Sequence, residues 1–87
     1  MKKTHLEDLL GLIVSARTKK DAEVLLYDLL TATEREAVVQ RLQIVKLIAK
    51  GVTHRKISAD LGVSISKVTR GSQALKVSKG LFKRLCK

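Results

Sequence analysis

The segment from Thr53 to Leu75 constrains the fold more than any other part of the chain, because its spacing suits two short helices joined by a tight turn. Ile57 and Leu61 lie four residues apart and therefore share one face of a first helix. Gly62 follows where the turn needs a left-handed backbone conformation, which glycine adopts at little cost. Val68 then anchors a second helix to the body of the domain. The pattern predicts a helix-turn-helix.

The rest of the chain also has helical spacing. It contains no proline, five glycines and 45% apolar residues. We expect a first helix ending near Arg17, a second over 21–30, and a third that begins at one of two overlapping capping boxes, Thr31 with Glu34 or Thr33 with Glu36, and ends at Gly51. The expected fold is all-α, with about six helices in one domain, 1–87. Its parts are dimerisation helices over 1–50, a helix-turn-helix over 53–76 and a C-terminal helix over 78–87.

The size of the chain favours association with a second copy. A chain of 87 residues buries only roughly 60–65% of the surface that its unfolded form exposes, so the core of a single copy is thin. Aliphatic residues are nevertheless abundant, whereas Tyr27 and Phe82 are the only aromatic ones. We therefore expect an intertwined homodimer that buries shared apolar surface.

Positive charge is concentrated in the second half of the chain. Residues 1–50 carry nine Lys and Arg against seven Asp and Glu, while residues 51–87 carry nine against one, Asp60. The half that contains the helix-turn-helix is therefore the strongly basic one. A surface that faces nucleic-acid phosphates explains this distribution, and a solvated face that aids solubility is the alternative.

A longer pattern resembles the Trp repressor family, a standard example of helix-turn-helix proteins. The run Val68–Ser72, followed by Leu75 and Lys76, is similar to the recognition helix of that family. The similarity extends upstream in the same order and nearly the same spacing, through Leu30-Thr31, Glu34–Ala37, Arg41, Ile44, Val45 and Gly51. Together these residues cover more than half of the chain, from about residue 30 to 76.

The resemblance implies a repressor that needs L-tryptophan as its corepressor. In that family the indole ring lies between two arginines, which correspond to Arg41 and Arg70, and a guanidinium plane stacks well on an aromatic face. Gly71, where an apolar anchor is common in helix-turn-helix proteins, would leave room for the ring. A surface or phosphate-binding role for the two arginines is the alternative.

Further ligand contacts follow from the same resemblance. Thr31 matches the threonine whose hydroxyl meets the ligand carboxylate, at a helix start where negative charge is favoured. Main-chain carbonyls near Asp28 and Leu30 would accept the ammonium group. Ile44 and Val45 would line an apolar wall.

The expected partner is double-stranded DNA with a palindromic operator. Candidate contacts lie on both helices of the motif, and we expect them at His54, Arg55, Ser58, Ile65, Ser66, Lys67, Thr69, Gln73 and Lys76. Two residues depart from the family pattern. Ala74 replaces a serine near the ligand, and Lys67 replaces a threonine and adds a possible phosphate or guanine contact.

Other classes of function have less support. No catalytic set, metal-ligand spacing or phosphate-binding glycine loop is present, so we expect neither an enzyme nor a metal protein. The single cysteine fits a reducing cytoplasm, and we expect no membrane span. The main hypothesis is a tryptophan-activated repressor of tryptophan biosynthesis or transport genes. The alternatives are a regulator on the same scaffold that ignores tryptophan and a small basic RNA-binding protein, for which stacking aromatics are scarce.

Overall fold

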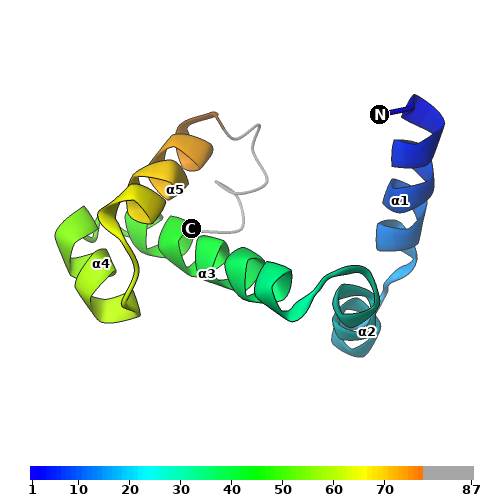
Figure 1. Cartoon of the computed structure of the whole chain (residues 1–87), viewed down its shortest axis with the longest axis horizontal. Helices are drawn as coiled ribbons and strands as arrows, with labels where there is room; N and C mark the ends of the chain where they lie inside the picture. Colours follow the sequence, from blue (N-terminus) through cyan, green and yellow to red (C-terminus); the bar gives the residue numbers. More distant parts are fainter. Residues whose placement is uncertain (78–87) are drawn as a thin grey trace. The chain divides into compact units, whose positions relative to one another are not determined.

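The structure is a computed structural model that describes residues 1–77. This part of the chain is entirely helical between its turns, as expected, and contains α1 (Lys3–Ser15), α2 (Lys19–Leu29), α3 (Ala32–Ala49), α4 (His54–Leu61) and α5 (Ile65–Val77) (Figure 1). The C-terminal helix expected over 78–87 lies outside the described residues, so five of the expected helices are observed. By its internal contacts the chain divides into two compact units, Met1–Glu36 and the residues from Ala37 onward.

The first unit contains two helices with largely exposed apolar side chains. No residue of α1 or α2 is buried. Helix α2 begins at Lys19, two residues earlier than expected, because Thr18 caps it: the Thr18 Oγ1 atom accepts a hydrogen bond from the Asp21 N–H at 3.0 Å. Helix α1 correspondingly ends at Ser15, before the extended residues that lead to this cap.

Hydrogen bonds define both the start and the end of helix α3. Of the two possible capping boxes, the Thr31–Glu34 box is formed: the Glu34 N–H donates to Thr31 Oγ1 at 3.2 Å, and the Thr31 N–H donates to Glu34 Oε1 at 2.8 Å. At the other end Gly51 adopts φ +85°, and the Val52 N–H donates to the Leu47 carbonyl at 3.1 Å. This is a Schellman motif, which explains why the helix ends two residues before the glycine.

The second unit holds the core. Ile44 from α3, Ile57 from α4, Val63 from the turn and Val68 from α5 are buried against one another. Partly buried apolar residues surround this cluster, namely Leu47, Ile48, Val52 and Leu61. The C-terminal half of α3 therefore supports the helix-turn-helix formed by α4 and α5, which pack against each other.

Candidate nucleic-acid interface and ligand cavity

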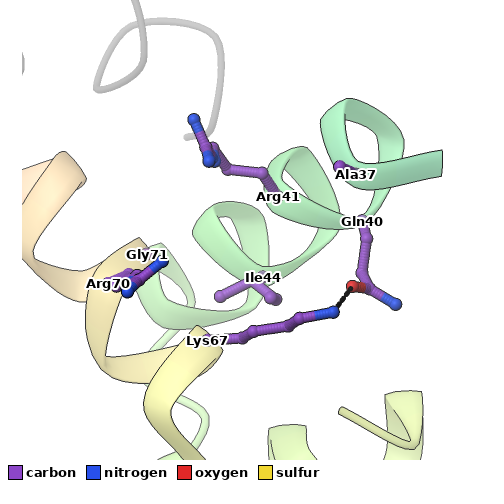
Figure 2. A pocket seen from close by; sticks show the side chains of 7 residues that line it. All are labelled: Ala37, Gln40, Arg41, Ile44, Lys67, Arg70 and Gly71. Atoms are coloured by element: carbon purple, nitrogen blue, oxygen red, sulfur yellow. Dashed lines mark hydrogen bonds between the residues drawn. The ribbon is translucent and has the colours of Figure 1, made fainter. Parts of the chain in front are cut away.

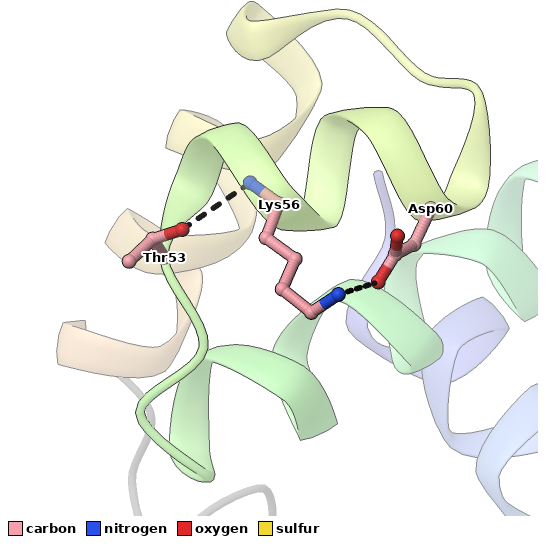
Figure 3. Close-up of polar contacts among 3 residues, drawn as sticks. All are labelled: Thr53, Lys56 and Asp60. Carbon is pink, nitrogen blue, oxygen red and sulfur yellow. Dashed lines mark hydrogen bonds and ion pairs between the residues drawn. The ribbon is translucent and has the colours of Figure 1, made fainter.

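Hydrogen bonds define both helix starts of the motif. The Lys56 N–H donates to Thr53 Oγ1 at 3.2 Å, and the Lys67 N–H donates to Ser64 Oγ at 3.2 Å. Figure 3 shows the first of these caps beside the ion pair between Lys56 Nζ and Asp60 Oδ2, at 3.1 Å. Side-chain caps of this kind satisfy N–H groups that a helix leaves without partners, so α4 and α5 begin at defined residues.

The turn between α4 and α5 has the conformation that the sequence predicts. Gly62 lies in the left-handed region at φ +65°. Ser58 adds a contact that sequence reasoning missed, because its hydroxyl donates to the Val63 carbonyl at 2.5 Å and ties the end of the turn to α4. Ser58 thus has a structural role, and its expected DNA contact stays a prediction.

The other residues expected at the DNA interface are exposed. On α4 these are His54 and Arg55, and on α5 they are Ile65, Ser66, Lys67, Thr69, Gln73 and Lys76. On α5 they alternate with the buried Val68 and Gly71, which face the core. The motif therefore exposes one largely polar, basic surface of α5 while its apolar surface holds the helix in place.

A cavity of about 230 Å³ lies between α3 and α5 within the second unit (Figure 2). Four of the residues around it were expected at a ligand site and Lys67 was expected only to contact DNA, whereas Ala37 and Gln40 were missed, although their i, i+3 and i+4 spacing with Arg41 on α3 contains the signal. The lining residues are Ala37, Gln40, Arg41, Ile44, Lys67, Arg70 and Gly71. The two arginines that the resemblance paired are thus brought to one cavity, Arg41 from α3 and Arg70 from α5.

The lining of this cavity is strongly cationic. Arg41, Lys67 and Arg70 each contribute a positive charge, and no lining residue is acidic. Ile44 provides an apolar surface, whereas Val45, expected on the same wall, is fully buried and does not line the cavity. The site combines cationic groups with a small apolar surface, a combination that suits a flat ligand carrying negative charge.

Gly71 has a packing role that sequence reasoning missed. It is buried, and a Cβ atom at this position would lie 2.5 Å from Ile44 Cγ2 and 3.5 Å from Ile44 Cβ. Ile44 is itself only 2% exposed, so it has little freedom to move away. The absence of a side chain at position 71 therefore lets the backbone of α5 lie close against α3. Its expected contact with a ligand ring stays a prediction.

The remaining candidate ligand residues lie in the first unit. Asp28 lines a different cavity there, of about 300 Å³, with residues of α1 and α2. The Leu30 carbonyl accepts a hydrogen bond from Arg35 Nη1 at 2.8 Å, and the Arg35 guanidinium carbon lies 4.0 Å from the centre of the Tyr27 ring. Thr31 Oγ1 accepts in the capping box, which leaves its hydroxyl hydrogen available to donate.

The part of the chain that the structure describes has neither a cluster of metal-binding side chains nor a membrane-spanning helix. Residues 1–77 contain no group of three or more His, Cys, Asp or Glu side chains placed to hold a metal ion. None of the helices over the same residues is long and apolar enough to cross a membrane.

Comparison with known proteins gives one consistent family. The model of the family described as "Trp repressor protein" matches residues 4–87. The Trp operon repressor homolog of Vibrio vulnificus strain YJ016 is 40% identical over 75 residues, which cover 85% of this chain and 74% of that protein. The homolog of Vibrio cholerae is 42% identical over 80% of this chain and 69% of its own length. That of Chlamydia caviae is 46% identical over 67% of this chain and 58% of its own length.

Proposed function

Because the chain belongs to the Trp repressor family, we propose that it is a transcriptional repressor that binds a palindromic operator as a homodimer and requires L-tryptophan as its corepressor. Members of this family are DNA-binding regulators and not enzymes, so the chain is a DNA-binding repressor. In this proposal the homodimer acts in the cytoplasm and controls genes of tryptophan biosynthesis or transport.

The cavity between α3 and α5 is the observation that carries the corepressor proposal. Its two arginines come from different helices, and a guanidinium plane can stack on an aromatic ring from either side. At about 230 Å³ the cavity is smaller than sites for drug-sized ligands, so it suits a small molecule. A ligand bound here would contact the recognition helix α5 through Arg70 and would thereby affect its position.

Two polar groups of the first unit, which the family resemblance assigns to ligand binding, keep hydrogen-bonding capacity for such a contact. The Thr31 hydroxyl can donate to a carboxylate without losing its capping bond. The Leu30 carbonyl already accepts from Arg35, but an oxygen with two lone pairs can accept a second hydrogen bond, here from an ammonium group. These contacts are proposed for the ligand-bound repressor.

Exposed apolar surface in the first unit supports the homodimer. The exposed large apolar residues of α1 and α2 are Leu6, Leu9, Leu10, Leu12, Ile13, Val14, Val24, Leu26, Tyr27 and Leu29. A folded chain rarely leaves so many large apolar side chains exposed on two consecutive helices. A second copy would cover these side chains on both chains at once. Two copies would also present two recognition helices, which suits an operator with two half-sites.

Ligand binding can be measured without background, because the chain contains no tryptophan. We expect L-tryptophan to show a saturable change in indole fluorescence on titration with the protein. Arg70→Ala should weaken this binding about tenfold by removing one of the two stacking groups. Arg17→Ala is the matched control, since it removes an arginine from an exposed position outside the cavity.

DNA binding is tested with a duplex selected from a random pool in the presence of L-tryptophan. We expect the selected sequence to be a palindrome and its affinity to fall when the amino acid is withdrawn. Affinity that is equal with and without tryptophan would instead favour the regulator that ignores this ligand. Preference for RNA over the selected duplex at the same salt concentration would overturn the repressor proposal itself.

A further inference from the structure

Lys67 is an exposed residue whose side chain lies along the edge of the cavity between α3 and α5. Its Nζ atom is hydrogen-bonded to Gln40 Oε1 at 3.3 Å, and both residues line the cavity. Figure 2 shows the lysine side chain extending from α5 past Ile44 toward α3. This contact joins residues 27 positions apart in the sequence, so it holds the ammonium group between the two helices that form the cavity.

The ammonium group keeps capacity for a further partner. A lysine ammonium has three N–H donors, and Gln40 accepts only one of them. Gln40 is neutral, so the positive charge of Lys67 is not balanced by this contact. Arg41 and Arg70 add two more positive charges in the same lining, which contains no carboxylate. An anionic group that enters the cavity would therefore meet three cations, whereas a cationic group would be repelled by all three.

We propose that Lys67 is a third cationic contact of the ligand cavity and makes it select aromatic ligands whose polar group is a carboxylate. The proposal rests on the proposed function, because it concerns the same ligand site. It assigns Lys67 a role in ligand choice, in addition to the DNA contact expected from its position on α5. Gln40 acts as a positioning residue that holds the ammonium group over the cavity.

Three indole compounds that differ only in their charged groups provide the test. L-Tryptophan carries both an ammonium and a carboxylate group, indole-3-propionate carries only the carboxylate, and tryptamine carries only the ammonium. Each is titrated by its own fluorescence against the full chain without DNA. In Lys67→Met, a variant of similar length without charge, we expect the Kd of the acid to rise about two- to fivefold, the range for an exposed ion pair. The Kd of the amine is expected to fall.

Two control variants separate the local contact from the net charge. Lys50→Met removes the same charge from an exposed position outside the cavity lining, so both Kd values should stay within error of those of the unmodified protein. Lys67→Arg keeps the charge and should keep the preference for the acid. Circular dichroism of each variant confirms that the helices are retained.

The outcomes distinguish this inference from the proposed function. If L-tryptophan binds but Lys67→Met changes the Kd values of acid and amine by the same factor, or changes neither, the role of Lys67 is refuted and the corepressor proposal stands. If none of the three compounds binds the unmodified protein, both are refuted. A similar change in Lys50→Met would assign the effect to net charge and would also overturn the inference.

Discussion

At the scale of single residues, the sequence explains the role of Gly71 only in part. The sequence marks the position as unusual, because an apolar anchor is common there, and the family resemblance suggests ligand space as the reason. The structure adds a reason that no spacing reveals, namely the distance between the backbone of α5 and Ile44. Arg41 and Arg70 could be paired from the sequence only through the resemblance, whereas the place of Lys67 in the same lining required coordinates.

Gly71→Ala should destabilise the second unit. The added methyl group would lie 2.5 Å from Ile44 Cγ2, and a buried isoleucine cannot move aside, so α5 must shift outward. We expect a loss of about 1–3 kcal/mol in the free energy of unfolding, the usual range for overpacking. Urea denaturation followed by circular dichroism at a fixed protein concentration measures this change.

Gly11→Ala is the matched control for that experiment. Gly11 lies inside α1, and a Cβ atom there would have nothing within 4 Å. Replacement of a glycine within a helix by alanine should raise stability by about 0.5–1 kcal/mol. If both variants change stability in the same direction, the close contact with Ile44 does not limit the size of the side chain at position 71.

At the scale of elements, the helices and their ends were largely predictable because their determinants are local. Thr53, Gly51 and Gly62 each act within a few residues of their own position, and each behaves as its residue type predicts. The choice between two overlapping capping boxes at the start of α3 was not predictable, because both have the same local chemistry. The cap at Thr18 was missed for a related reason, since the apolar pattern alone does not mark where a polar helix start lies.

The turn between α4 and α5 should tolerate asparagine better than alanine at position 62. Gly62 has φ +65°, where a Cβ atom is strained, and alanine there is expected to cost about 1–2 kcal/mol. Asparagine visits this conformation more readily, so Gly62→Asn should lose less stability. A Cβ atom meets nothing within 4 Å at this position, so steric contact does not confuse the comparison. Thermal or urea unfolding of the two variants gives the order, and equal losses would contradict a conformational cause.

At the scale of the whole molecule, the two units differ in how their apolar residues are covered. The second unit buries Ile44, Val45, Ile57, Val63 and Val68 within the chain itself. The first unit buries no residue of α1 or α2. The abundance of aliphatic residues in a short chain predicts that apolar surface is shared with a second copy, but composition does not identify which helices leave that surface exposed.

Leu10→Glu should weaken self-association. Leu10 is 48% exposed on α1, so roughly half of the 1.5–3 kcal/mol that full burial of a leucine contributes remains to be gained in each copy, and its loss from both copies should raise the dimer dissociation constant about tenfold or more. Sedimentation velocity over a range of concentrations measures the constant. Thr4→Glu adds the same charge to an exposed polar position of α1 and serves as the control. Equal constants for the two variants would mean that the apolar surface of α1 does not form the dimer.

The contact between Gly71 and Ile44 also has a consequence for how such a chain can evolve. Side chains at the two positions would occupy the same space, so a substitution at one position alters which residues the other tolerates. A lineage that acquires alanine at position 71 would first need a smaller residue at position 44, such as valine or alanine. We therefore expect the two positions to change together among related repressors, even though they lie 27 positions apart in the chain.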